Sequence, residues 1–254
     1  DGLFVITGAK SNLLYHYSKN ENKMIQLQSL KFSHRNGGLL IHSKSSSLIC
    51  LSGDRSKAVE RFSDSTFIKG YNKKSYRIKP QIESEWTSLP DIHRDRSNAG
   101  YILSGDLIYA FFGYSESSKS YVQTIERLDL SKDYMSNYDW EDISFKLIDN
   151  DLSSSISSFV CIDNKNEDEI LIVGGLNGLN NLENNKIISF NIGRKELSIK
   201  CQFECHNFMF SNGQTPIPLN DNDNNVLFGV VEDGNENRIL TVEPTQPAFG
   251  IIRY

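Results

Sequence analysis

The sequence predicts an all-β fold built from repeated units, and two observations support this prediction. Helical periodicity is nearly absent, because the apolar runs are short, rich in β-branched and aromatic residues, and separated by Gly, Asn, Asp and Ser. In addition, several of these runs end in glycine at similar intervals along the chain. The runs are continuous rather than alternating, which is typical of strands covered on both faces. We therefore expect stacked sheets rather than a sheet with one wet face.

Five units are each anchored by an apolar run that ends in glycine. The runs are Ile6-Thr7-Gly8, Leu51-Ser52-Gly53, Phe111-Phe112-Gly113, Val173-Gly174-Gly175 and Leu227-Phe228-Gly229. The first glycines of successive runs are 45, 60, 61 and 55 residues apart. This spacing indicates one four-stranded unit per repeat, with insertions in the loops. Glycine at the strand end supplies the positive φ or the close backbone approach that a tight bend needs.

The other strands of a unit are placed by their position relative to this glycine. After the anchor, Val59-Glu60-Arg61-Phe62 in the second unit matches Ile125-Glu126-Arg127-Leu128 in the third. Before the anchor, Asn36-Gly37-Gly38 matches Asn98-Ala99-Gly100. A β-sandwich of unrelated strands is the alternative architecture, but it leaves these paired strings unexplained. The repeat therefore extends beyond the glycine.

These features resemble the kelch-repeat β-propellers. Their repeat has a small-residue strand, a hydrophobic strand ending in Gly-Gly, a strand reading roughly Val-Glu-x-Tyr-Asp, and a tryptophan strand. Here Trp86 and Trp140 follow the third strand of two units, and Gly174-Gly175 keeps the double glycine. The resemblance implies one β-propeller domain over residues 1–254, with four-stranded blades packed radially. The recognisable units are approximately 1–30, 31–91, 92–150, 151–200 and 201–254.

The blade number stays open at this point. Either residues 249–254 close the ring, or upstream residues contribute and the full ring holds six or more blades. Residues 64–85 are the most basic stretch of the chain and are interpreted as an insertion or as eroded strands. Its cationic and aromatic residues are Lys69, Tyr71, Lys73, Lys74, Tyr76, Arg77 and Lys79. Such a stretch is a solvated hairpin or a partner contact.

Composition excludes several classes of partner. Lys and Arg total 27 against 32 for Asp and Glu, so the net charge of −5 predicts no broad phosphate-binding face and no nucleic acid partner. No apolar run approaches the roughly 18 residues of a membrane helix, so no membrane partner is expected. The four cysteines are too few for a disulfide scaffold, and the chain has no Asn-X-Ser/Thr site. The first apolar run lacks the preceding basic segment of a signal peptide, and we expect a cytoplasmic protein.

Motifs with catalytic or metal-binding chemistry are weak. Cys201-x-x-x-Cys205-His206 has no second ligand pair, and the glycine-rich stretch 174–178 lacks the Lys-Ser pair and helix start of a phosphate cradle. We therefore predict neither metal nor cofactor. The alternative function is a carbohydrate-active propeller enzyme of oxidase, sialidase or sugar mutarotase type. The tyrosines, cysteines and arginines for such sites are present, but no motif places them together.

The remaining function is recognition by loops. In kelch propellers, the loops after the glycine and the loops before the opening strand gather on one face, and a rigid scaffold often presents binding residues on its loops. The predicted partner-binding residues are Lys10, Arg35, Asn36, Arg55, Arg94, Arg96, Asn98, Tyr114 and Asn177. Arg and Tyr contribute strongly to interfaces, and arginine binds carboxylates bidentately. Arg35 and Arg96 have a second interpretation, which is to hold neighbouring loops together through backbone carbonyls.

We therefore predict a non-catalytic module that binds a partner peptide or protein, with an acidic segment as the matching ligand. The resemblance implies a scaffold or substrate-receptor role, such as delivery to a ubiquitin ligase or tethering to the cytoskeleton. It also implies additional domains of the same polypeptide outside this segment.

Overall fold

The fold is all-β, as predicted. The computed structural model describes residues 2–6, 12–18, 22–45, 47–63, 86–132, 137–164, 168–178, 182–202, 229–233, 236–242 and 249–252. Within these ranges the strands form several antiparallel sheets, and one short 3-10 helix, η2 (Leu130–Lys132), follows a strand. Among the described residues, no helix is long and apolar enough to span a membrane. Lys10, residues 64–85 and the Cys205-His206 pair lie outside the described ranges.

The second predicted unit forms a four-stranded antiparallel sheet. Its strands are β4 (Gly38–His42), β5 (Ser47–Gly53), β6 (Ser56–Ser63) and β7 (Trp86–Leu89), and they lie in that order. Every residue of β5 is buried. This burial confirms that a continuous apolar run indicates a strand covered on both faces.

The third unit repeats the same arrangement. Its strands β8 (Gly100–Ser104), β9 (Leu107–Phe111), β12 (Ile125–Asp129) and β13 (Glu141–Ile143) form a four-stranded sheet in chain order. A small hairpin of β10 (Tyr114–Ser115) and β11 (Ser120–Tyr121) is inserted between β9 and β12. Glu126 pairs with Ala110 on the preceding strand, just as Glu60 pairs with Cys50. The matched Glu-Arg strings therefore occupy equivalent positions in the two sheets.

The sheet of the fourth unit has one strand more than the four predicted, and the added strand comes from the end of the third unit. Its main strands are β16 (Val160–Asn164), β17 (Glu169–Val173), β20 (Lys186–Asn191) and β21 (Glu196–Gln202). β14 (Lys146–Leu147) adds to the outer side, parallel to β21. A separate three-stranded sheet contains β15 (Ile156–Ser157), β18 (Leu176–Asn177) and β19 (Leu182–Glu183). A strand as short as β14 has no periodicity of its own, and its pairing with β21 depends on contacts distant in sequence.

Within the described residues, the first and last units each contain a three-stranded sheet. The first contains β1 (Gly2–Ile6), β2 (Leu14–Ser18) and β3 (Lys23–Gln26), and the last contains β22 (Gly229–Asp233), β23 (Glu236–Val242) and β24 (Phe249–Ile252). Gly229 was predicted to end a strand, but β22 continues from Gly229 to Asp233. The reason is that Val230 and Val231 favour a strand, while Asp-Gly-Asn after them is a turn sequence. Asp233 accordingly pairs with Glu236.

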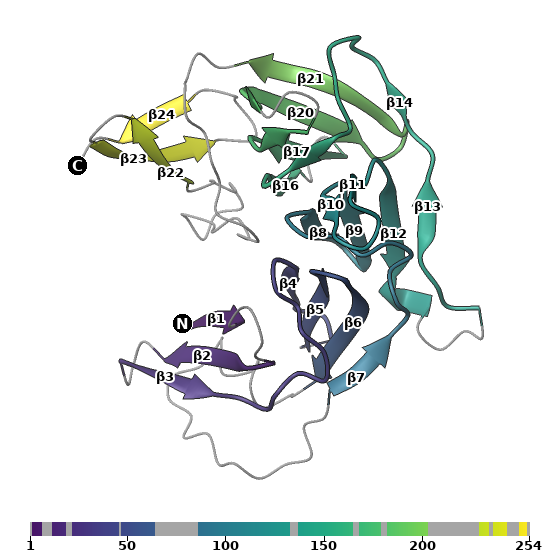
Figure 1. The fold of residues 1–254 in the computed structure, drawn as a ribbon, viewed down its shortest axis with the longest axis vertical. Helices are drawn as coiled ribbons and strands as arrows, with labels where there is room; N and C mark the ends of the chain where they lie inside the picture. Colours follow the sequence, from purple (N-terminus) through teal and green to yellow (C-terminus); the bar gives the residue numbers. More distant parts are fainter. Residues whose placement is uncertain are drawn as a thin grey trace.

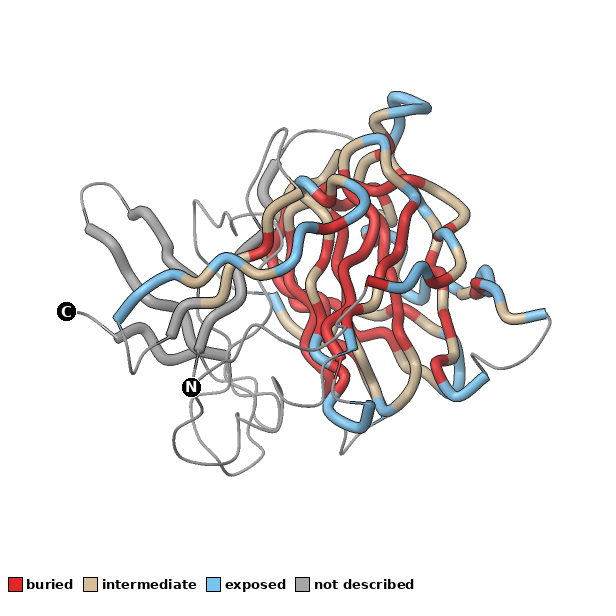
Figure 2. Tube along the Cα trace, turned by 90° about the horizontal axis from the view of Figure 1, so that it is seen from below, coloured by how far each residue is buried: buried red, intermediate tan, exposed pale blue. Residues whose placement is uncertain are grey.

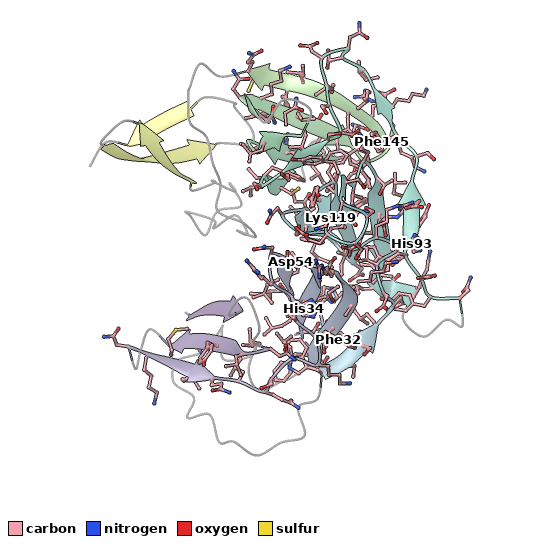
Figure 3. The ribbon with its side chains drawn as sticks, in the orientation of Figure 1. Phe32, His34, Asp54, His93, Lys119 and Phe145 are labelled. Atoms are coloured by element: carbon pink, nitrogen blue, oxygen red, sulfur yellow. The ribbon has the colours of Figure 1, made fainter. Side chains whose placement is uncertain are left out.

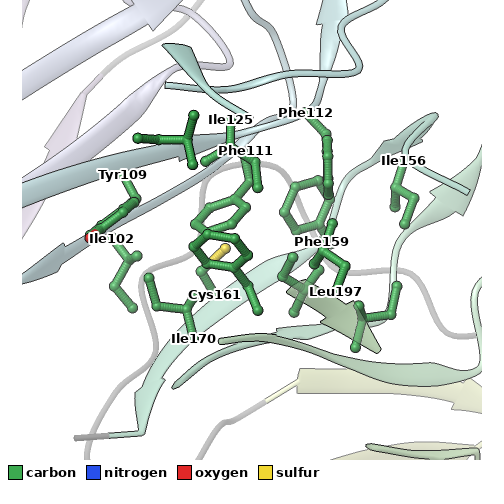
Figure 4. Close-up of a cluster of buried hydrophobic side chains, with 14 of the residues drawn as sticks. Ile102, Tyr109, Phe111, Phe112, Ile125, Ile156, Phe159, Cys161, Ile170 and Leu197 are labelled. Atoms are coloured by element: carbon green, nitrogen blue, oxygen red, sulfur yellow. The ribbon is translucent and has the colours of Figure 1, made fainter. Parts of the chain in front are cut away.

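The sheets follow one another in chain order around an arc, and β4, β8 and β16 lie on its inner side (Figure 1). The buried residues concentrate in the strands, and the exposed residues concentrate in the turns at the two edges of the sheets (Figure 2). The apolar core lies between neighbouring sheets. Between the third and fourth sheets, one cluster joins Phe111 and Ile125 to Phe159, Ile170 and Leu197 (Figure 4). Further clusters join the second sheet to the third and the first sheet to the second.

Glycines at the start of the inner strands allow these sheets to approach closely. A Cβ on Gly38 would lie 2.5 Å from Cδ2 of Tyr101 on the next sheet. A Cβ on Gly100 would overlap the ring of Phe159 and lie 2.5 Å from Sγ of Cys161. The last glycine of the matched Asn-small-Gly strings is therefore required by packing between sheets.

Candidate functional site

The predicted binding loops that the structure describes lie at one edge of the sheets. Because antiparallel strands reverse direction at each turn, the loop before a first strand and the turn after a second strand share an edge. We call this edge the loop edge. It contains residues 27–37, 54–55, 90–99, 112–124, 148–159 and 174–178. The opposite edge contains residues 43–45, 105–106, 130–132, 137–140 and 192–195.

Backbone hydrogen bonds connect the loop edge from one sheet to the next. The amide of Asn98 donates to the carbonyl of Asn36 at 2.9 Å, and the amide of Ser158 donates to the carbonyl of Asn98 at 2.8 Å. All three residues have a left-handed backbone conformation, with φ of 55° at Asn36, 54° at Asn98 and 57° at Ser158. Asparagine tolerates this conformation better than most residues. Asn36 and Asn98, which we predicted to contact a partner, thus connect neighbouring loops through their backbones.

The anchor glycines allow a second set of close contacts at this edge. A Cβ on Gly53 would lie 2.6 Å from the carbonyl oxygen of Arg35. The corresponding distances are 2.8 Å from Gly113 to the carbonyl oxygen of Ser97 and 2.7 Å from Gly175 to that of Ser157. Each of these glycines also has a positive φ. In the fourth unit, Gly175 rather than Gly174 therefore corresponds to the anchors of the second and third units. The predicted anchor spacing is shifted there by one residue.

Arg35 and Arg55 lie on the loop edge of the second sheet. The Arg35 Nε lies 3.4 Å from Oδ2 of Asp54, and the side-chain amide of Asn36 donates through Nδ2 to Oδ1 of Asp54 at 3.1 Å. The Arg35 side chain is still 51% exposed. Arg55 is exposed and follows Asp54 in the turn between β5 and β6. Asp54 lies toward the inner side of the arc (Figure 3).

Arg96 holds neighbouring loops together, which is the second of its two predicted roles. Its side chain is fully buried and forms an ion pair with Glu126. It also donates to the carbonyls of Phe112 at 3.1 Å and Thr124 at 2.8 Å. A partner cannot reach this guanidinium. The prediction that Arg96 binds a partner is therefore replaced by a structural role, because a buried carboxylate recruits the nearest cation.

Arg94 remains accessible but is paired. Its guanidinium is 41% exposed, and it donates to Oδ1 of Asp142 at 2.8 Å and to Oε1 of Glu126 at 3.2 Å. The hydrogen bond from Arg94 lowers the pKa of Asp142, and the same bond raises the pKa of Arg94. His93, toward the outer side of the arc (Figure 3), lies 3.7 Å from Oδ1 of Asp142.

His93, Glu126 and Asp142 also form a group of metal-binding residue types whose ligand atoms lie within 4.8 Å of one another. Both carboxylates already accept hydrogen bonds from Arg94, and Glu126 also binds Arg96. A metal ion would add a further positive charge beside two guanidinium groups. The arrangement therefore fits an ion-pair network that fixes the loop.

The β10–β11 hairpin carries the next predicted residue. Tyr114 is half-buried, and its ring packs edge-on against Tyr121 with centroids 5.4 Å apart. The buried carboxylate of Asp95 accepts hydrogen bonds from Oγ of Ser115 at 2.8 Å and from the amide of Ser117 at 3.1 Å. Tyr114 is thus held rigidly at the loop edge.

Asn177 lies in β18 and is half-buried, where it pairs with Ile156. The structure therefore brings most predicted residues to one edge but leaves only part of them accessible. Sequence reasoning did not assign roles to Asp95, Glu60 or Glu126. For the two glutamates the signal was present, because both lie in the matched Glu-Arg strings.

No protein-family model matches the chain. No curated protein matches it by sequence. The solved structure of YjhT is similar to it, with a TM-score of 0.62 and 11% sequence identity. The similarity covers 99% of this chain and 80% of YjhT. At this identity the likeness concerns the fold alone, and it shows that the succession of sheets is an arrangement found in a solved protein.

Proposed function

We propose that this chain is a kelch-like β-propeller that serves as a non-catalytic interaction module and binds a segment of a partner protein across the loop edge. The succession of similar sheets around an arc supports the propeller interpretation. One observation carries the function: exposed Arg35, Arg55 and Arg94 reach the same edge from two successive sheets. Rigid presentation of such residues costs little entropy on binding.

The chemistry of this edge favours an acidic segment that carries an apolar residue. Phe32 is 48% exposed on the loop before β4, three residues before Arg35 in the chain. Arg35 pairs with Asp54, and Arg94 pairs with both Glu126 and Asp142. A carboxylate of the ligand therefore binds the N–H groups of these arginines that remain unpaired. Exposed pairs of this kind contribute little to stability, and exchanging a partner is therefore inexpensive.

The test begins with selection of binding peptides from a random peptide library displayed on phage, with the full chain as the target. We expect an acidic consensus with an apolar position, and a synthetic peptide of that consensus would then be measured by calorimetry. A variant carrying Arg35→Ala, Arg55→Ala and Arg94→Ala is expected to weaken binding by roughly tenfold or more.

The matched control removes three cations from the opposite edge through Lys132→Ala, Arg194→Ala and Lys195→Ala. The control variant is expected to bind as the unmodified chain does, and both variants are first checked by thermal melting. If the control loses as much affinity as the loop-edge variant, the effect is one of net charge. If the loop-edge variant binds normally, the proposed surface is wrong.

A further inference from the structure

Two glutamates at equivalent positions hold the loops that enter their sheets. Glu60 on β6 and Glu126 on β12 are both fully buried. Glu60 accepts hydrogen bonds from the backbone amides of Lys31 at 2.9 Å and Phe32 at 3.0 Å. Glu126 accepts one from the backbone amide of His93 at 2.8 Å. Each carboxylate therefore anchors the backbone of the loop before the first strand.

The basic side chain that pairs with each carboxylate differs between the sheets. In the third sheet it is Arg96, which lies 30 residues before Glu126. In the second sheet it is His34, which lies 26 residues before Glu60. The fourth sheet has Ile156 and Ile188 at these two positions, both in one apolar cluster. A buried carboxylate needs a paired cation, whereas an apolar pair needs none.

Each ring nitrogen of His34 faces an oxygen atom. Its Nδ1 lies 2.8 Å from the carbonyl oxygen of Ser52, and its Nε2 lies 2.9 Å from Oε2 of Glu60. The carbonyl oxygen of Ser52 can only accept a hydrogen bond, and Oε2 of Glu60 also accepts when the Glu60 carboxyl is ionised. A neutral imidazole carries one N–H and an imidazolium carries two. Only the protonated ring can donate to both acceptors.

We propose that residues 31–36 form a proton-dependent latch. While His34 is protonated and Glu60 is ionised, the pair holds the loop through the amides of Lys31 and Phe32. When His34 loses its proton, one ring nitrogen faces an acceptor without a hydrogen, and Glu60 remains buried without a cation. The loop then opens, and the equivalent loop of the third sheet stays closed because arginine does not deprotonate in proteins.

The groups around the pair support this assignment. Burial raises the pKa of Glu60, but hydrogen bonds from His34, Phe32 and Lys31 outweigh it, and the pKa lies below its ordinary value. Cys50 pairs with Glu60 across the strands, and burial followed by the Glu60 charge raises its pKa, so this thiol remains neutral. The nearby charged groups are Arg35 and Asp54, which pair with each other. The Glu60 carboxylate is thus the charge that His34 contacts among the described residues.

The experiment measures hydrogen exchange of the latch amides in the full chain. Histidine changes charge between about pH 5 and 8. Over this range, after correction for intrinsic rates, we expect protection of the Lys31 and Phe32 amides to fall roughly tenfold or more. The His93 amide serves as the internal control, and its protection is expected to stay constant because Arg96 remains charged.

Three substitutions sharpen the test. His34→Arg copies the third sheet and is expected to remove the pH dependence, while His34→Gln is expected to leave the loop unprotected at every pH. His93→Gln is the matched control and is expected to leave the latch unchanged. In the unmodified chain, nitrogen resonances of His34 provide a readout that needs no variant. A neutral His34 ring while the loop is protected, or equal loss of protection at His93, would overturn the proposal.

Discussion

Replacing Gly100 by alanine is expected to separate the inner strands of two neighbouring sheets. Gly100 begins β8, and its added methyl group would overlap Cε2 of Phe159 and lie 2.5 Å from Sγ of Cys161. Non-bonded heavy atoms of this kind normally lie about 3.5–4.0 Å apart. The thiol of Cys161 would therefore have to retreat by about 1 Å or more, and the ring of Phe159 would have to move as well.

The structure offers little space for this movement. Phe159 and Cys161 are both buried, and the Phe159 ring packs against Phe112 with centroids 6.1 Å apart. Overpacking typically costs about 1–3 kcal/mol, and two simultaneous overlaps place Gly100→Ala near 3 kcal/mol. The reduced flexibility of the unfolded chain offsets about 0.4–1 kcal/mol. We therefore expect a net loss of about 2 kcal/mol, or a Tm lower by about 4–8 °C for a chain of this size.

Thermal melting and urea unfolding measure this loss. Gly193→Ala is the matched control, because Gly193 is exposed and the nearest atom to its added Cβ is Oδ2 of Asp168 at 3.3 Å. Its expected effect is within about 0.5 kcal/mol of zero. Combining Gly100→Ala with Phe159→Leu removes the ring atoms that overlap, so the combined loss should be smaller than the sum of the two single losses. An unchanged Tm for Gly100→Ala, or strictly additive losses, would refute close packing between the sheets.

Three further expectations concern buried polar groups. Glu126→Ala leaves a buried guanidinium without its carboxylate, and urea unfolding should show a loss of about 3–5 kcal/mol; a loss below about 1 kcal/mol would contradict the buried pair. Trp140→Phe removes the indole N–H that donates to the carbonyl of Pro90 at 2.9 Å, and the same measurement should show a loss of about 1–3 kcal/mol rather than none. Burial raises the pKa of both Cys50 and Cys161, so neither should react with an aromatic disulfide reagent at about pH 8 until the chain is unfolded. Mass spectrometry of the labelled chain locates the reacted thiols, and rapid labelling of Cys50 or Cys161 in the folded chain would contradict this expectation.

The repeated strings were the part of the sequence that predicted structure well. The Glu-Arg strings occupy equivalent strands, and the final glycine of each Asn-small-Gly string lies where two sheets meet. The strands and their glycine turns depend on residues close together in the chain. For that reason local sequence was sufficient to predict them.

The candidate site was less predictable. Arg94 and Arg96 are two residues apart in the same loop, yet one is 41% exposed and the other is fully buried. The difference depends on Glu126, which lies 30 residues after Arg96 and is brought to it by the sheet. The strand β14 and the correspondence of Gly175 to the other anchors depend on similar distant contacts.

By itself the sequence determined that the chain is all-β, that its units repeat, and which segments form the loops at one edge. Tertiary structure alone decided which cations of that edge stay accessible and which are paired with buried carboxylates. The physical reason is that strand and turn preferences arise from neighbouring residues, whereas the burial of a charge depends on the sheets packed around it.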